Sequence, residues 1–352
     1  MLHKGKHIAV IRLSAMGDVA MTVPVILALV KQYPTVEVTV VSRPFYKPFF
    51  KTIPNVTFMS AHTRHRHKGL LGIYRLYRDL KENNVEVIAD LHDVLRSKIL
   101  RYLFSKFGGL AAFTDKGREE KKALTSLKDK DFKPLKSMVE RHVETFKKLG
   151  YHLDMSTPVF LERLEISEKV KEIIGDKNGK WIGIAPFAHY GSKTYPLDLM
   201  REVITALAKD KSIKIALFGG GKHEKVLLDK MATGLENVYN FTKVISFEEE
   251  LQLISNLDVM LSMDSGNGHL AAMYGVKTIT LWGATHPYAG FIPYNQPMEN
   301  CLVADRTQYP LLPTSVYGDK KVSGYEDAMR TISVEKVVFS IQSQLAVSEN
   351  CD

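Results

Sequence analysis

The feature that most constrains the fold is an alternation of short apolar strands with helical patterns, which occurs twice along the 352 residues. In the first half, strands are expected at His7–Leu13, Val36–Ser42, Val56–Met59 and Val85–Asp90. Helical patterns fall at 19–32, 70–83 and 138–149, and the charged stretch 114–137 is predicted to be a mobile loop. Strands that alternate with helices predict a parallel sheet covered by helices.

The same pattern starts again after residues 151–175. Strands are expected at Lys180–Pro186, Ile213–Phe218, Val238–Tyr239, Leu257–Met263 and Lys277–Trp282, with helices at 197–209, 222–233, 247–255 and 267–274. An amphipathic helix at 333–346 ends the chain. A chain of this length suits two domains, which we place at 1–165 and 178–330, followed by the segment 331–352. Two domains of this kind bind ligands in a crevice at the carboxyl ends of their strands.

Charge and composition narrow the class of partner. Lys and Arg number 48 against 39 acids, a net charge of +9 that favours a nucleic acid, a phosphorylated substrate or an acidic membrane surface. Neither aromatic interleaving nor a recognition helix accompanies the basic residues, so nucleic acid is not the predicted partner. No apolar run approaches the roughly 18–20 residues that span a bilayer, and no signal peptide is visible. The two cysteines, Cys301 and Cys351, lack zinc-site spacing, so we expect a cytoplasmic protein.

The segment 257–287 carries the strongest chemical pattern. A buried strand ends in Asp264, Ser265, Gly266, Asn267, Gly268 and His269, and a short helix follows. Glycines and small polar residues there leave backbone N–H groups exposed, and these stabilise phosphate oxygens. On local chemistry alone, an equally good interpretation is that Asp264 or Ser265 caps the helix and that the glycines only turn the chain.

Two further loops follow expected strands of the second half. The run Gly219–Gly221 with Glu224 lacks both the triphosphatase and the dinucleotide spacing, which argues against an NAD enzyme. It is either a flexible turn or a close approach of Gly220 to a nucleotide, with Glu224 on the ribose hydroxyls. In the loop 185–196, Ser192 and Lys193 could meet a leaving phosphate; a lone loop lysine is otherwise solvated.

The first half contains one acidic residue and four cationic residues that could take part in a site. Asp18, in IRLSAMGDVAMTVP, lies where the first strand passes into the first helix, so it either caps that helix or acts in catalysis. Four cations, Arg64, Arg66, Lys68 and Arg96, could bind an anionic acceptor or form solvated faces. The pair Asp129 and Asp131 lies in a charge run rather than at a strand end, so no metal site is predicted.

Three segments, IRLSAMGDVAMTVP, PFAHYGSKTYP and MDSGNGHLAAMYGVKTITLWGATHP, together resemble the ADP-heptose:lipopolysaccharide heptosyltransferases of glycosyltransferase family 9. The resemblance implies an α/β protein of the GT-B type, with two Rossmann-like domains whose mainly parallel sheets face each other across a cleft. It implies that the domain 1–165 binds the acceptor and that the domain 178–330 binds the nucleotide-sugar. It also implies that the C-terminal helix, within 331–352, packs back on the first domain. It also implies an inverting, metal-independent transfer without a cofactor, of a sugar such as heptose, to a lipopolysaccharide-core acceptor.

The resemblance also implies a role for each matched residue. Asp18 would be the general base, Lys193 with Ser192 would contact the donor phosphate, and Ile245 would touch the nucleotide base. Glu224 would hold the ribose, and the loop 264–269 the diphosphate and sugar. Ser265 stands where the family often has Thr, and 188–191 replaces a threonine-rich stretch, which bears on the identity of the sugar.

The same resemblance favours a monomer at the cytoplasmic face of the inner membrane, in peripheral contact with it. Three alternatives stay open. The first is a family 9 transferase with another donor, and the second is a GT-B-fold nucleotide-sugar epimerase that needs no acceptor. The third is a non-catalytic protein that binds anionic glycans or nucleic acid through its basic surface.

Overall fold

The computed structural model describes residues 7–347 and divides into two compact units. Unit 1 comprises residues up to Arg118 together with Lys136–Leu161. Unit 2 comprises Glu119–Leu135 and the chain from Glu162 onward. Within the described range, no helix has the length and apolar character needed to cross a membrane.

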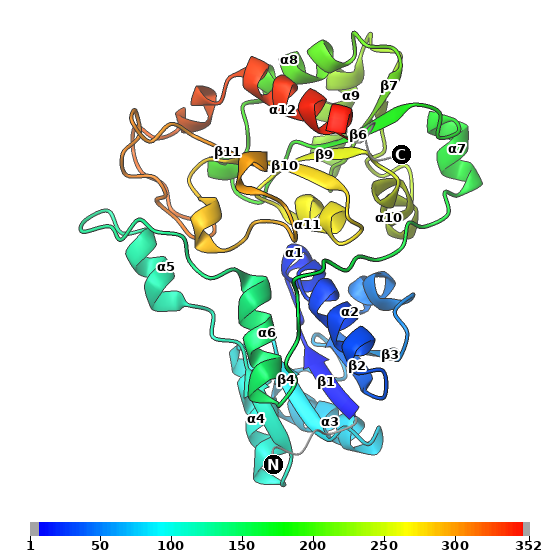
Figure 1. Cartoon of the computed structure of the whole chain (residues 1–352), viewed down its shortest axis with the longest axis vertical. Coiled ribbons are helices and arrows are strands. Elements are labelled where there is room, and N and C mark those ends of the chain that lie inside the picture. The colour runs from blue at the N-terminus through cyan, green and yellow to red at the C-terminus, as the bar shows by residue number, and fades with distance from the viewer. Residues whose placement is uncertain (1–6, 348–352) are drawn as a thin grey trace. The chain divides into compact units, whose positions relative to one another are not determined.

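Unit 1 is built on a five-stranded, all-parallel sheet in the order β3-β2-β1-β4-β5 (Figure 1). The strands are β1 (His7–Ile11), β2 (Glu37–Ser42), β3 (Val56–Ser60), β4 (Val87–Asp90) and β5 (Leu110–Phe113). The helices are α1 (Met16–Ala20), α2 (Val23–Gln32), α3 (Gly69–Glu82), α4 (Leu95–Lys106) and α6 (Met138–Lys148). Ile11 pairs with Val41 on one side and with Asp90 on the other. The direction of strand order therefore reverses between β1 and β4, and the loops that follow these two strands border the ligand crevice of such a sheet.

The helices α3 and α4 cover one face of this sheet. Leu76 and Leu80 of α3 and Leu100 and Phe104 of α4 are buried against β1 and β4. Successive strand residues point to opposite faces, so Ala9 and Ile11 belong to this layer and Ile8 and Val10 to the other. Helix α3 follows β3 in the chain and α4 follows β4, and each helix runs antiparallel to the strand before it. Both helices therefore begin at the carboxyl edge of the sheet.

Unit 2 carries a six-stranded, all-parallel sheet in the order β11-β10-β9-β6-β7-β8. The strands are β6 (Lys180–Ala185), β7 (Ile213–Leu217), β8 (Val238–Asn240), β9 (Val259–Met263), β10 (Lys277–Trp282) and β11 (Cys301–Val303). The helices are α5 (Arg118–Leu124, whose first residue belongs to unit 1), α7 (Glu168–Ile174), α8 (Leu197–Leu207), α9 (Lys222–Ala232), α10 (Phe247–Ser255), α11 (Gly266–Ala272) and α12 (Val334–Val347). This is the strand order of the dinucleotide-binding fold, and its reversal lies between β6 and β9.

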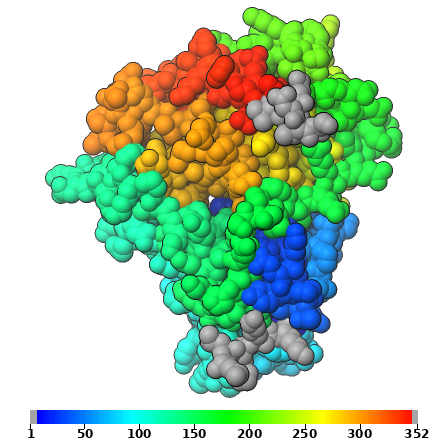
Figure 2. Space-filling view, in the orientation of Figure 1, coloured from blue at the N-terminus to red at the C-terminus, as the bar shows by residue number. Residues whose placement is uncertain are grey.

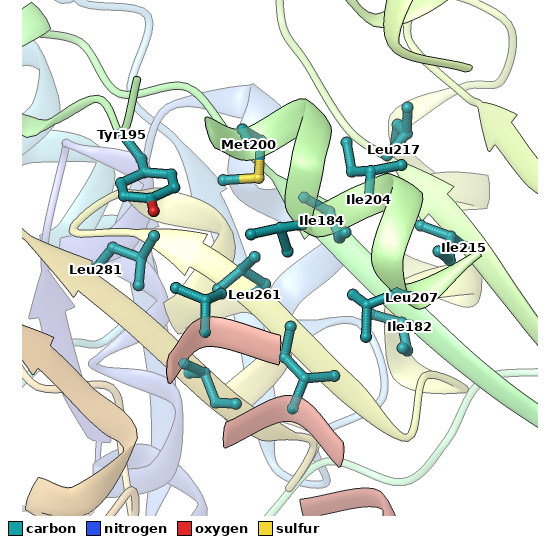
Figure 3. Packing of buried hydrophobic residues seen from close by; sticks show 14 of the residues in the cluster. Ile182, Ile184, Tyr195, Met200, Ile204, Leu207, Ile215, Leu217, Leu261 and Leu281 are labelled. Carbon is teal, nitrogen blue, oxygen red and sulfur yellow. The ribbon is translucent and has the colours of Figure 1, made fainter. Parts of the chain in front are cut away.

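An apolar layer of unit 2 lies between its sheet and α8. Figure 3 shows Met200, Ile204 and Leu207 of α8 directed toward the strands. Their partners in the sheet are Ile182, Ile184, Ile215, Leu217, Leu261 and Leu281. Burying side chains of this kind contributes about 1.5–3 kcal/mol each to folding, so this layer fixes the strands whose ends carry the polar loops.

The C-terminal helix α12 corrects one expectation of the sequence. Its apolar residues Val337, Ile341 and Leu345 are buried in the core of unit 2, and it packs on α8, β9 and β10. It was expected to pack back on the first domain. Figure 2 shows this helix, in red, at the surface of unit 2. The sequence predicted an amphipathic helix here, but it did not determine which apolar surface covers the apolar face of that helix.

The stretch 114–137 is the second correction, because it contains α5 and is not a free loop. Residues 119–135, assigned by the sequence to the first domain, belong to unit 2. The N–H of Leu135 donates to the Tyr288 carbonyl over 2.9 Å, and Lys130 Nζ donates to the Pro313 carbonyl over 2.7 Å. The Phe132 ring lies 4.9 Å from that of Tyr288, with the Arg306 guanidinium 3.4 Å from its centre. These partners lie more than 150 residues from 130–135 along the chain, so no local sequence pattern could predict the contacts.

Candidate functional site

The strand-order reversal of unit 2 brings together two loops that are 71 residues apart in the chain. Lys193, in the loop after β6, forms an ion pair with Asp264, which directly follows β9. The Nζ to Oδ2 distance is 2.9 Å, and both side chains are largely buried. A cation fixed at the carboxyl edge of a parallel sheet can offset the negative charge of a phosphate ligand. Lys193 is therefore not the freely solvated loop lysine of the simpler interpretation.

Close backbone contacts hold the Lys193 loop in place. The N–H of Ala284, after β10, donates to the Ser192 carbonyl over 3.0 Å. A Cβ atom at Gly283 would lie 2.5 Å from that carbonyl oxygen, so only glycine permits this approach. Ser192 Oγ donates to the Gly318 carbonyl over 2.6 Å. The predicted contact residue Ser192 is thus a brace for the loop, and its hydroxyl already has an acceptor.

The turn 264–269 is held in place by Ser262, a buried residue of β9. Ser262 Oγ accepts from the N–H of Gly268 over 3.1 Å and lies 3.1 Å from Ser265 Oγ. Ser265 stands at the N-cap of α11 but makes no side-chain cap hydrogen bond. Asp264 is engaged with Lys193. The alternative in which these two residues only cap the helix is therefore not what the structure contains. His269 is buried in the same turn.

The glycine loop after β7 forms a second polar cluster of unit 2. Glu224 Oε2 accepts from the N–H of Gly220 over 2.5 Å, which folds the carboxylate over the loop. Thr242 Oγ1 is buried and has no hydrogen-bond partner within the described residues. A Cβ at Gly219 would lie 3.0 Å from this hydroxyl and 3.2 Å from Glu224 Oε2. Sequence reasoning missed Thr242, because only the pairing of β7 with β8 brings residue 242 beside the loop.

Ile245 lies just outside this cluster, half-buried, next to the N-terminus of α10. The adjacent Ser246 accepts from the N–H of Glu249 over 3.2 Å. The Glu249 carboxylate accepts in turn from the N–H of Ser246 over 2.7 Å. This reciprocal capping box fixes the backbone that follows Ile245.

In unit 1, Asp18 both caps a helix and pairs with a cation. Its Oδ2 accepts from the N–H of Ala15 over 3.1 Å, at the start of α1. The same oxygen lies 2.7 Å from a guanidinium nitrogen of Arg12, and the side chain of Asp18 is 26% exposed. Arg12 is buried and also donates to the carbonyls of Ser14 and Leu91. The carboxylate is thus held rigidly at the reversal between β1 and β4, with part of its surface open.

Arg12, His92 and Lys116 complete this cluster and were not singled out from the sequence. Burial, followed by the positive charges of Arg12 and Lys116, lowers the pKa of His92 to about 3. Burial also lowers the pKa of Lys116, with Arg12 and Arg118 adding to the effect. Their position in the sequence could have identified two of them, since Arg12 directly follows β1 and His92 lies two residues after the end of β4.

The low pKa of His92 predicts an acid-sensitive unit 1. An unfolded histidine titrates near 6.5, so the unfolded chain binds more protons than the folded one between about pH 6.5 and 3. The stability that the neutral ring contributes is full above pH 6.5 and declines as pH falls through this window. His92→Gln should therefore show a smaller drop in Tm from pH 7 to pH 5 than the parent. The exposed His65→Gln is the control, and an equal drop in all three proteins would contradict the prediction.

The four predicted acceptor cations divide into two kinds. Arg66 forms two hydrogen bonds to Asp79, of 2.6 and 3.3 Å, and Arg96 donates to the His67 carbonyl. These two side chains hold the loop 62–68 against α3 and α4. Arg64 and Lys68 are exposed. The structure therefore leaves Arg64 and Lys68 as the members of the set that can reach a ligand without first giving up a contact found here.

Within residues 7–347, no group of three or more His, Cys, Asp or Glu side chains is placed to hold a metal ion. Asp18, Asp264 and Glu224 each stand as the single carboxylate of their cluster, paired with a cation or bonded to a backbone N–H group.

Comparison with known proteins identifies the family. The model for glycosyltransferase family 9 (heptosyltransferase) matches residues 73–320, more than half of the chain. Lipopolysaccharide heptosyltransferase 1 of Campylobacter coli is 24% identical, covering 80% of this chain and 85% of its own. Lipooligosaccharide heptosyltransferase 2 of Haemophilus influenzae is 26% identical, covering 97% and 99%. The structure of E. coli heptosyltransferase WaaC with ADP has a TM-score of 0.70 at 20% identity, covering 96% and 99%, and confirms the predicted GT-B fold class.

Proposed function

Because the chain belongs to glycosyltransferase family 9, we propose that it transfers heptose from ADP-heptose to a sugar of the lipopolysaccharide core. Relatives that match over most of their length are named lipopolysaccharide and lipooligosaccharide heptosyltransferases. Structures of similar fold hold ADP or a fluorinated ADP-heptose, which supports a nucleotide-sugar as the donor.

The observation that carries the proposal is the Lys193–Asp264 pair at the strand-order reversal of unit 2. Lys193 meets the donor diphosphate, together with backbone N–H groups of the turn 264–269 and the His269 side chain. Glu224, Thr242 and Gly220 form the ribose side of the donor site, and Ile245 lies against the base. A preorganised cation is effective here because the leaving diphosphate gains negative charge as the glycosidic bond breaks.

Asp18 is the general base of the proposed reaction. The acceptor hydroxyl oxygen forms a bond to the anomeric carbon while the bond from that carbon to the diphosphate oxygen breaks. The hydroxyl proton passes to the Asp18 carboxylate, which must lie within hydrogen-bond reach of it. A single displacement of this kind inverts the anomeric centre and requires neither a metal nor a second carboxylate as nucleophile. Arg12, 2.7 Å from Asp18 Oδ2, fixes the orientation of this carboxylate.

The acceptor and the site of action follow from the same proposal. A lipopolysaccharide core is anionic, and Arg64 and Lys68 are the exposed cations of unit 1 proposed to bind it, with Arg66 and Arg96 ordering their loop. The enzyme works as a monomer at the cytoplasmic face of the inner membrane, where such an acceptor is assembled on lipid.

A panel of nucleotide-sugars tests the donor. ADP-heptose should raise Tm most, because a ligand that binds only the folded state stabilises it by mass action. Turnover should then require a lipopolysaccharide-core acceptor. Greater stabilisation by another nucleotide-sugar would overturn the donor assignment. Fast conversion of a nucleotide-sugar without acceptor would instead favour the epimerase alternative.

A further inference from the structure

The outer faces of α3 and α4 expose large apolar side chains near the carboxyl edge of the unit 1 sheet. Leu70 and Leu71, in the first turn of α3, are 70% and 75% exposed, and Leu95, the first residue of α4, is 75% exposed. Tyr74 and Tyr102 follow on the same two helices, at 49% and 64% exposed. We call these five residues the α3–α4 face.

Contacts within unit 1 place the two parts of the α3–α4 face next to each other. Helices α3 and α4 pack side by side on one face of the sheet. Arg96, beside Leu95, donates to the His67 carbonyl, and His67 lies only three residues before Leu70. A Cβ at Gly72 would come within 2.2 Å of the His67 backbone, so the loop 62–68 is held tightly against α3. The exposed leucines of both helix starts therefore flank the same basic loop.

The segments that carry this face are rich in cations. Residues 61–78 contain five Lys or Arg and no acid, and residues 94–107 contain four and no acid. Three of the nine are paired with acids at 3.0 Å or less: Arg66 with Asp79, Arg78 with Glu82, and Arg101 with Asp90. Arg64, Lys68 and Arg75 are exposed without an ion pair among the described residues, and Lys98, 46% exposed, is 3.7 Å from Asp93. Apolar side chains bordered by cations and tyrosines are typical of surfaces that insert into the interface of an anionic bilayer.

We propose that the α3–α4 face docks unit 1 on an anionic lipid bilayer, with Leu70, Leu71 and Leu95 inserted among the acyl chains and the surrounding cations against the headgroups. This inference deepens the proposed function and rests on it for its purpose. Leu95 directly follows the loop 91–94 after β4, and the Leu91 carbonyl of that loop accepts from Arg12, the partner of Asp18. Docking would therefore present Asp18 to an acceptor sugar carried on lipid. A second protein copy or a soluble partner is the competing occupant of an apolar surface.

Vesicle co-sedimentation of the full chain tests the proposal. The protein should bind vesicles of phosphatidylcholine and phosphatidylglycerol, bind pure phosphatidylcholine at least tenfold more weakly, and lose binding as salt screens the cations. The triple variant Leu70→Ser, Leu71→Ser, Leu95→Ser should bind at least tenfold more weakly than the parent. The matched control changes exposed apolar residues of unit 2, Val226→Ser, Val244→Ser and Met298→Ser, and should bind as the parent does.

Three outcomes would overturn the proposal: no binding of the parent to anionic vesicles, equal binding of the leucine triple variant, or a concentration-dependent dimer that this variant abolishes while vesicle binding is unchanged. The leucine variant should keep the parent Tm and its turnover on a delipidated acceptor, and should lose turnover only on acceptor embedded in vesicles. If the parent and the variants bind vesicles but none of them transfers sugar, the result counts against the proposed function alone. If the parent transfers sugar but does not bind vesicles, the result counts against the docking surface alone.

Discussion

Asp18→Asn is expected to lower kcat by at least about 100-fold, because a general base contributes roughly two to four orders of magnitude to such a step. The substituted amide retains a carbonyl that can accept from the N–H of Ala15, so the cap on α1 survives. What is lost is the negative charge beside Arg12, at a cost in stability of about 1–3 kcal/mol. Arg12 keeps the carbonyls of Ser14 and Leu91 as acceptors, which limits this cost.

Steady-state transfer assays and calorimetric titration with the donor separate catalysis from binding. The variant should bind the nucleotide-sugar as the parent does while turnover falls. The matched control is Asp198→Asn, which also removes a first-turn helix carboxylate paired with an arginine, at 2.8 Å from Arg330. Asp198→Asn should leave turnover unchanged. Near-normal turnover of Asp18→Asn would remove Asp18 from the role of base.

Lys193→Met should lower kcat by about 100-fold and weaken the binding of the nucleoside diphosphate at least tenfold. Removing one preorganised group that stabilises the negative charge developing in a transition state lowers the rate by about two to three orders of magnitude. Removing a hydrogen bond to a charged group costs about 1.5–3 kcal/mol, which corresponds to tenfold or more in affinity. Asp264, largely buried, would also lose its cation and repel the phosphates.

A second lysine of unit 2 provides the control for this loss. Lys177 forms a partly buried ion pair with Asp258, beside the first strand of the same sheet. Lys177→Met removes a comparable pair away from the loops of the donor site, so Tm should fall while the affinity for ADP stays at the parent value. Equal affinity for ADP in Lys193→Met and the parent would show that Lys193 does not contact the donor phosphates.

Much of the fold was readable from local patterns. The strands β1, β2, β3, β4 and β6 to β10 lie where alternating apolar segments predicted them, within a few residues. Helices α4 and α7 and the short strands β5 and β11 were not predicted. The helical pattern at 19–32 proved to be two helices, α1 and α2, with Pro24 in the first turn of the second. A proline there is compatible with a helix start, so periodicity alone did not separate the two.

The candidate site was predictable as a set of residue types but not as a set of contacts. Asp18, Lys193, Glu224 and the turn 264–269 were noticed because each follows an expected strand. Their partners were harder to foresee, because Thr242 joins the glycine loop only through strand pairing. The segment 119–135 joins unit 2 through aromatic and backbone contacts with residues near 286–313.

By itself, the sequence determined the alternation of strands and helices, the division into two such halves, and the polar residues at the strand ends. Tertiary structure decided which strand ends are neighbours. Strand order follows from how whole helices and strands pack around a core, and no local stretch encodes it. That order made Asp264 the partner of Lys193 and set His92 beside the Asp18 loop, and it turned scattered strand-end residues into two defined polar clusters.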